Sequence, residues 1–142
     1  MLWLRQNILK HFESNAARST FPVIQLRFVL DEIVFREAVF AELQLFASKD
    51  RQLGLQTRTG SLDIPLEITC SWLEDTYCQF DNLVLNVFSD AEVAAIERFH
   101  AFVAETADSL PSSLGRVESW HVCESWLAIM RQAKLALNAF AV

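Results

Sequence analysis

Residues 62–72 read Leu-Asp-Ile-Pro-Leu-Glu-Ile-Thr-Cys-Ser-Trp, with an apolar side chain at every second position. Such alternation is typical of a strand that buries one face. Pro65 would lie on the outer face and indicates an edge or a bulge, because proline donates no ladder hydrogen bond. Residues 53–57 alternate in a similar way, and Thr59 and Gly60 supply a turn. The sequence therefore predicts a β-hairpin in this region.

The hydrophobic period changes at Ser89, where Ser89 and Glu92 form an S-x-x-E capping box. Apolar residues then recur three or four positions apart until Pro111, which predicts a helix over about residues 89–110. A second helical stripe predicts another helix over about residues 118–140. Because only a short loop joins them, we expect the two helices to pack antiparallel.

Residues 22–48 fit either strands or a helix. Alternation at Ile24, Leu26 and Phe28 favours a strand, whereas Phe35 and Val39 belong to a helical face that continues to Leu43 and Phe46. We expect strands, and hence an α+β fold. It would have an antiparallel sheet over about residues 22–88, two antiparallel C-terminal helices and a short N-terminal helix. The alternative is a mostly α-helical domain with one hairpin.

The chain has 142 residues, of which 52% are hydrophobic, and this size predicts a single domain over residues 1–142. Eleven phenylalanines and four tryptophans are difficult to bury entirely in one small domain, so we expect some at an interface, with a homo-oligomer favoured. Three cysteines without a C-x-x-C pair, and no secretory or membrane-spanning pattern, predict a cytoplasmic protein that does not enter a membrane.

Charge is distributed unevenly along the chain. Residues 61–115 contain ten acids and one base, a net charge of −9, whereas residues 1–60 carry +2 and residues 116–142 carry +1. The total of −6 repels nucleic-acid phosphates, so we expect no nucleic-acid partner. The acidic block favours a basic protein as partner.

Residues that could perform chemistry are scattered. His100 lies on the apolar stripe of the first predicted helix, and we expect it to be a core histidine. His121 and Cys123 are two apart, so on a helix they would point in different directions and could not share a metal ion. Cys70 is expected on the buried strand face and Cys78 in a polar context, neither of which activates a thiol. The sequence predicts no catalytic, metal or cofactor site.

The sequence therefore predicts a small non-catalytic interaction module that binds a protein partner or a second copy of itself. The candidate partner-binding residues are Asp63 and Glu67, on the outer face of the predicted strand, and Trp120 and His121, near the start of the last helix. Two alternatives remain open. One is a small-ligand binder with an aromatic-lined pocket, and the other is an enzyme of unrecognised type.

Overall fold

The computed structural model describes residues 23–78 and 87–141, with side chains described from residue 31 onward. Every regular element in these ranges is a helix, so the predicted antiparallel sheet over residues 22–88 and the α+β class are wrong. The alternative of a mostly α-helical domain fits in part, but its hairpin is absent from the described residues. The predicted N-terminal helix lies in residues 1–22, outside the described part of the chain.

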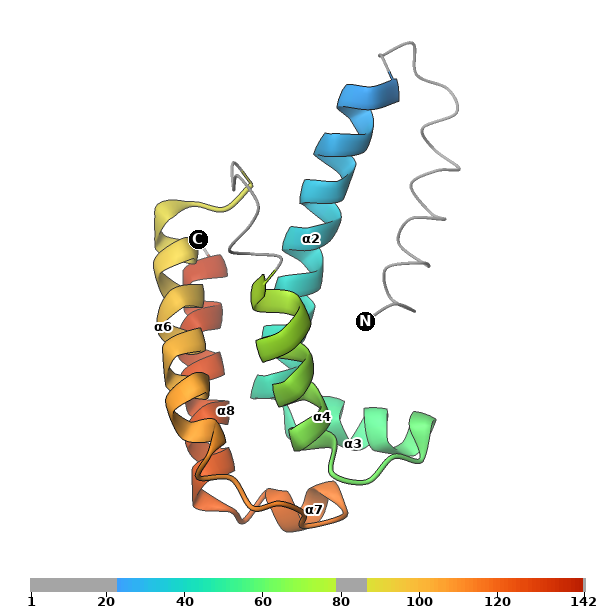
Figure 1. Ribbon diagram of the computed structural model, residues 1–142, viewed down its shortest axis with the longest axis vertical. Coiled ribbons are helices and arrows are strands. Elements are labelled where there is room, and N and C mark those ends of the chain that lie inside the picture. The colour runs from blue at the N-terminus through green and yellow to red at the C-terminus, as the bar shows by residue number, and fades with distance from the viewer. Residues whose placement is uncertain (1–22, 79–86, 142) are drawn as a thin grey trace.

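The described elements follow one another as α2 (Val23–Ala47), α3 (Lys49–Thr59), α4 (Ile64–Cys70), the π-helix η1 (Ser71–Thr76), α6 (Asp90–Ala107), α7 (Val117–Trp120), α8 (Glu124–Leu137) and the 3₁₀-helix η2 (Asn138–Phe140). Figure 1 shows α6 and α8 side by side, with α2 next to them. Helix α8 packs against both α2 and α6. Helices α3 and α7 lie together at one end of the molecule.

Residues 64–72 lie in helices, α4 and the start of η1, because the alternation of this stretch contains a helical series. Ile64, Ile68 and Trp72 are four residues apart and are buried in the core. The other apolar positions of the alternation lie outside this face: Leu62 is 56% exposed and Cys70 is also exposed. Pro65 occupies the first turn of α4, where its missing N–H removes no intrahelical hydrogen bond.

The helical interpretation of residues 35–46 is correct. Phe35, Val39, Leu43 and Phe46 are all buried along one face of α2. Around Phe46 the core is aromatic, with ring centroids 6.1 Å from Trp72, 5.1 Å from Phe99 and 5.9 Å from Trp126. These large side chains join α2, η1, α6 and α8, and at least these aromatics are used in the core rather than at an interface.

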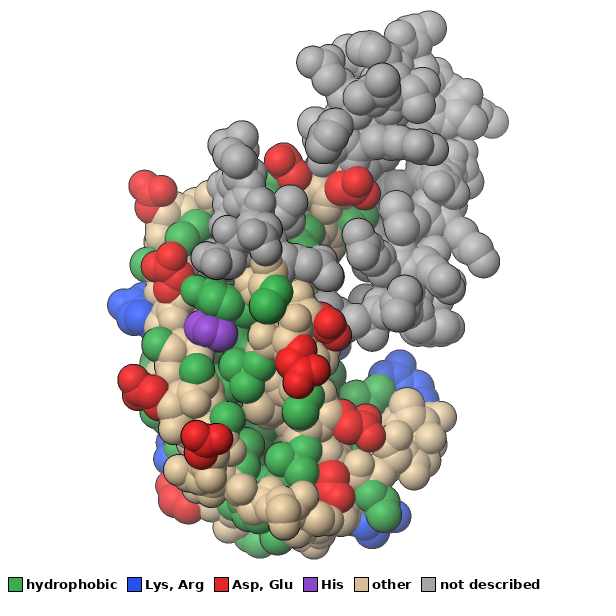
Figure 2. Space-filling view, viewed as in Figure 1, with side chains coloured by type: hydrophobic (Ala, Val, Ile, Leu, Met, Phe, Trp, Pro, Cys, Tyr) green, Lys and Arg blue, Asp and Glu red, His purple; other side chains and the backbone are tan. Residues whose placement is uncertain are grey.

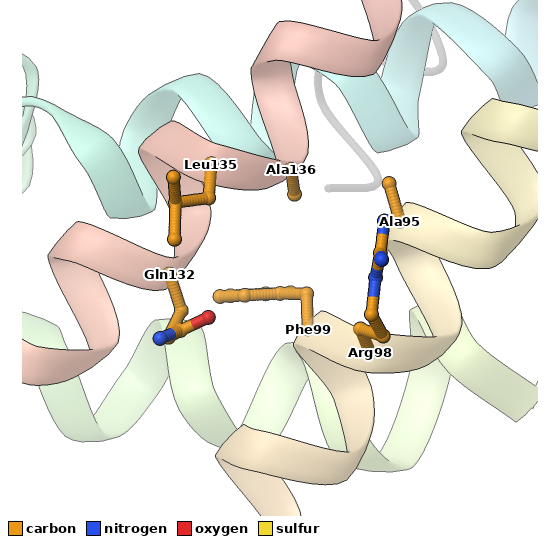
Figure 3. Close-up of a pocket in the computed structure, with 6 residues that line it drawn as sticks. All are labelled: Ala95, Arg98, Phe99, Gln132, Leu135 and Ala136. Atoms are coloured by element: carbon orange, nitrogen blue, oxygen red, sulfur yellow. The ribbon is translucent and has the colours of Figure 1, made fainter.

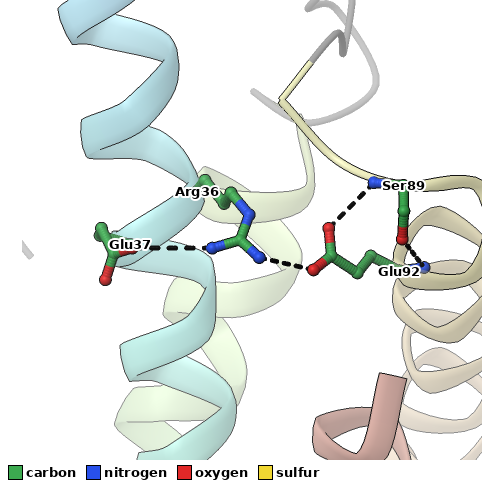
Figure 4. A network of polar contacts seen from close by, with 4 residues as sticks. All are labelled: Arg36, Glu37, Ser89 and Glu92. Carbon is green, nitrogen blue, oxygen red and sulfur yellow. Dashed lines mark hydrogen bonds and ion pairs between the residues drawn. The ribbon is translucent and has the colours of Figure 1, made fainter. Parts of the chain in front are cut away.

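The start of α6 confirms the predicted capping box. Ser89 Oγ accepts a hydrogen bond from the Glu92 N–H at 3.2 Å, and Glu92 Oε2 accepts one from the Ser89 N–H at 2.9 Å. The other carboxylate oxygen of Glu92 bonds Arg36 of α2 at 2.5 Å, as Figure 4 shows. One carboxylate therefore caps α6 and also ties it to α2.

The helix predicted over residues 118–140 is divided. Helix α7 ends at Trp120, and α8 begins after Cys123, which occupies its N-cap position. None of the described helices combines the length and the apolar character that a membrane-spanning segment requires.

Candidate functional site

Three of the four residues predicted to bind a partner lie near one another, where α3, α7 and the starts of α4 and α8 meet. The centre of this junction is Gln52 of α3, which is fully buried. Its amide nitrogen donates to the carbonyl oxygens of Leu45 and Phe46, both at 3.0 Å. Its amide oxygen accepts from Trp126 Nε1 at 3.2 Å and bonds His121 Nε2 at 2.9 Å.

The bonds to Gln52 also determine the state of His121. Carbonyl oxygens only accept hydrogen bonds, so Leu45 and Phe46 set the orientation of the Gln52 amide. The amide oxygen then faces His121, whose Nε2 must carry a proton. Burial lowers the pKa of His121 below its ordinary value, and the nearby Lys49 ammonium lowers it further, while Glu118 opposes them. His121 is therefore mainly a neutral donor that joins α7 to α3.

Asp63 accepts hydrogen bonds from four groups. Its Oδ2 accepts from Ser113 Oγ at 2.7 Å, and its Oδ1 accepts from the N–H groups of Leu114 and Gly115, each at 2.8 Å, and from Trp120 Nε1 at 3.2 Å. The Ser113 hydroxyl is the main cause that lowers the pKa of Asp63, with the backbone and indole donors adding to it. This carboxylate fastens the start of α4 to the loop before α7.

The backbone of Asp63 takes part in the same attachment. Its N–H donates to the Gly115 carbonyl at 2.7 Å, and its φ of 54° lies in the left-handed region. Among non-glycine residues, aspartate and asparagine tolerate this conformation best. Both the backbone conformation and the carboxylate of Asp63 therefore stabilise the fold at this position.

Trp120, a candidate partner-binding residue, lies in the core: its side chain is 0% exposed and it packs against Trp126 with ring centroids 6.3 Å apart. His121 is only half-buried, so part of its ring reaches solvent. Glu67 lies on the exposed side of α4, where no strand face exists. Of the four predicted residues, Glu67 is therefore the most accessible to a partner.

The junction includes a second buried glutamine that the sequence analysis did not single out. Gln56 follows Gln52 by one helical turn, and its Oε1 accepts from the Val117 N–H at 2.7 Å, at the start of α7. Its Nε2 donates to Glu118 Oε2 at 3.4 Å. The available signal was the four-residue spacing of two uncharged amides in α3, an otherwise polar helix.

A different surface gathers the acidic residues. Figure 2 shows hydrophobic side chains along the line between α4 and α6, with acidic side chains on both sides of it. We name this line the apolar seam. Tyr77, which stacks on His100 of α6, lies between the two helices, and Leu66, Cys70 and Leu73 precede it on α4 and η1 at helical spacing, in steps of four, three and four residues. We count these four residues as part of the seam. The exposed acids on or next to α4, η1 and α6 include Glu67, Glu74, Glu97 and Asp108.

Two stacked rings, one of them from α6, meet at the apolar seam. Tyr77, directly after η1, stacks on His100 of α6 with ring centroids 3.3 Å apart and planes 5° apart. His100 is half-buried, and its Nδ1 atom is shielded from solvent, so the prediction of a core histidine is correct only in part. Cys70 lies exposed in the seam instead of on a buried strand face. Glu74 and Asp75 are part of the π-helix η1.

A groove of about 320 Å³ lies on the other side of α6, between it and α8. Figure 3 shows side chains of both helices lining it: Ala95, Arg98, Phe99, Gln132, Leu135 and Ala136. Phe99 is its single aromatic residue. Trp72, Trp120 and Trp126 fill the core instead, so they do not line this groove.

Within residues 23–78 and 87–141, no three side chains of the metal-ligating types converge on one point. Cys123 precedes α8 and His121 follows α7, so the two do not share a helix as predicted. No family model, curated protein or solved structure matches the chain. The function is therefore inferred from the surfaces and contacts described above.

Proposed function

We propose that this protein is an interaction module that binds a basic amphipathic helix of another protein along the apolar seam. The observation that carries the proposal is the combination of an apolar line with acids on both sides of it (Figure 2). A helix that presents leucine-like side chains to such a line and lysine or arginine beside them matches it in both hydrophobicity and charge.

The spacing of the seam supports a helical ligand. Leu66, Leu73 and Tyr77 are partly buried hydrophobics that pack on the core and leave part of their surface exposed. Two helices that pack with a shallow crossing angle interlock through side chains three and four residues apart. A partner helix can therefore extend the packing that joins η1 to α6 through Trp72 and Phe99.

The charge distribution supports a different protein over a second copy of this chain. In a two-fold symmetric dimer the same surface patch occurs on both sides of the interface. Glu67 and Glu74 would then lie close to the same acids of the other copy, and like charges across an interface are unfavourable. A basic partner neutralises these acids instead.

A binding assay with defined peptides tests the proposal. The probe is a fluorescent amphipathic peptide of leucine and lysine, about 18 residues or ~27 Å long as a helix. A leucine–glutamate peptide of the same length is the comparison. We expect binding of the lysine peptide only, and weakening of at least about tenfold between 0.05 and 0.5 M NaCl, because salt screens exposed charges.

Two charge-reversal variants locate the binding surface. Glu67→Lys with Glu74→Lys is expected to abolish binding of the lysine peptide. The control, Asp31→Lys with Asp50→Lys, changes the net charge equally at exposed positions on α2 and α3 and is expected to bind nearly as the native chain does. Equal losses in both variants, or equal binding of the two peptides, would rule out the seam as a specific docking site.

The groove between α6 and α8 favours small-ligand binding as a second candidate function. Its volume is within the usual range of small-ligand pockets, which begins at about 300 Å³. Arg98 lies beside the apolar Phe99 and Leu135, a combination suited to a short fatty acid (Figure 3). Octanoate should then raise the melting temperature of the native protein but not of Arg98→Gln. No shift at millimolar octanoate would remove this candidate.

A further inference from the structure

Glu42 is a carboxyl group buried in the helical core. It lies on α2 and its residue is only 5% exposed. Its Oε2 accepts a hydrogen bond from Thr76 Oγ1 at 2.5 Å, and the Ser71 hydroxyl is also hydrogen-bonded to this carboxyl. Its Oε1 is buried and has no hydrogen-bond partner among the described residues. Only one of the two carboxyl oxygens, Oε2, therefore has a hydrogen-bond partner that the structure places.

The two hydroxyls belong to Ser71 and Thr76, the first and last residues of the π-helix η1. In an α-helix, residues five apart are separated by about 140° around the axis, so Ser71 and Thr76 could not both face one carboxyl. The wider π-turn, with bonds from residue i to i+5, brings them closer to the same side. The Tyr77 N–H accordingly bonds the Trp72 carbonyl, five residues earlier. The π-turn and Glu42 thus fit each other.

Burial is the main influence on this group and raises the pKa of Glu42 to about 7, although the bonds from Thr76 and Ser71 oppose the change. Asp75 of η1 adds a small repulsion in the same direction as burial. The other charged residues on the elements around it are all exposed: Glu67 of α4, Glu74 of η1, and Glu124, Arg131 and Lys134 of α8.

We propose that Glu42 is a proton-controlled latch that holds η1 against α2 while its carboxyl is neutral and releases η1 when it ionises. A neutral carboxyl leaves only an uncharged oxygen without a donor, whereas an ionised one leaves a buried, partly unsatisfied charge. Separation of η1 from α2 lets water reach that charge. Residues 71–77, which include Leu73 and Tyr77 of the apolar seam, are therefore the segment that opens.

The sign of the pH dependence follows from the direction of the shift. A folded-state pKa above the unfolded value means that the native state holds the proton more tightly, so the closed latch is favoured at low pH. That advantage is complete below about pH 4.5 and is lost as the pH rises through about 7. An effect on partner binding would in addition rest on the proposed function, so the test below uses no partner.

Amide hydrogen exchange of the native chain at pH 6 and pH 8 measures the latch, after correction for the intrinsic exchange rates. The pKa of Glu42 is about 7 in the closed state and about 4.5 in the open state. Linkage therefore lowers the protection of residues 71–77 by about tenfold between pH 6 and pH 8. Amides of α8 are expected to change much less. Glu42→Gln should keep η1 protected at both pH values, whereas the control Glu37→Gln, an exposed carboxyl on the same helix, should behave like the native chain.

Equal protection of residues 71–77 at pH 6 and pH 8 in the native chain would overturn the proposal, and so would a tenfold loss that persists in Glu42→Gln. If Glu42→Gln does not fold, the pKa of Glu42 in the native chain can be measured instead, by NMR of its carboxyl carbon. Titration of Glu42 near its ordinary value of about 4.5 would refute the latch, and titration near pH 7 together with the loss of protection would support it.

Discussion

Replacement of Gln52 by leucine removes the amide that connects α2, α3, α7 and α8. Leucine keeps the fully buried space largely filled but cannot bond the carbonyls of Leu45 and Phe46 or the indole N–H of Trp126. His121 also loses its partner, but its ring is half-buried and can bond water. The variant therefore leaves three groups unsatisfied in or near the core.

The expected cost follows from these three groups. A buried polar group left without a partner costs about 1–3 kcal/mol. Three such groups cost roughly 3–9 kcal/mol, of which burial of the more apolar leucine offsets about 1–2 kcal/mol. Partial solvation of the Leu45 carbonyl reduces the cost further. We expect a loss of about 4 kcal/mol, a large fraction of the ~5–15 kcal/mol by which domains are usually stable.

Urea unfolding at pH 7, followed by tryptophan fluorescence, measures this loss. With an m-value of about 2 kcal/mol/M, the midpoint should fall by about 2 M. The matched control is Gln44→Leu on α2, which makes the same chemical change at a half-buried position and should alter stability by about 0.5 kcal/mol or less. A Gln52→Leu midpoint that equals the control would refute the role assigned to the amide.

Three further changes test other parts of the structure. Gly54→Ala should raise the free energy of unfolding by about 0.5–1 kcal/mol in urea titrations, because Gly54 is within α3 and an added Cβ meets no atom within 4 Å. Ser89→Ala should lower it by about 1 kcal/mol, whereas Ser89→Asp, which keeps an acceptor at the N-cap, should lose much less. Asp63→Ala should melt at a lower temperature than Asp63→Asn at pH 7. Because the pKa of Asp63 is lowered in the folded protein, its contribution is present above about pH 4 and is lost as the pH falls through the folded value. A melting difference between Asp63→Ala and the native chain that stays constant down to pH 2.5 would contradict this assignment.

Local signals predicted the C-terminal half of the fold well. The capping box at Ser89 and the break at Pro111 depend on residues only a few positions apart, and α6 begins and ends close to where they indicated. The same signals did not predict the division between α7 and α8. That division depends on Gln56, which bonds the first N–H of α7 from 61 residues away, and no local pattern records such a contact.

The error over residues 62–72 has a specific physical cause. Alternation with period two contains every fourth residue, so Ile64, Ile68 and Trp72 fit a strand face and a helix face equally well. Pro65 was the local evidence for a helix, since proline suits a first helical turn and does not suit a ladder. The burial of Thr69 and the exposure of Cys70 decide between the two patterns, and both are properties of the packed molecule.

The candidate site, like the fold, could be predicted from the sequence only in part. Asp63, Trp120 and His121 were predicted to bind a partner, yet in the structure Asp63 and Trp120 share a hydrogen bond and His121 bonds Gln52. These partners are 57 and 69 positions apart in sequence. Glutamine and aspartate side chains carry no pattern that indicates whether they will meet water or each other. Their roles could therefore be recognised only after the helices were placed.

Composition and capping, which are properties of neighbouring residues, were enough to establish the excess of acids in residues 61–115 and the start of α6. Three features became visible only in the folded molecule: residues 64–72 are helical, Glu42 is buried beside a π-turn, and acids lie on both sides of one apolar seam. The physical reason is that burial and long-range hydrogen bonds depend on which segments meet, and that is a property of the whole packed chain.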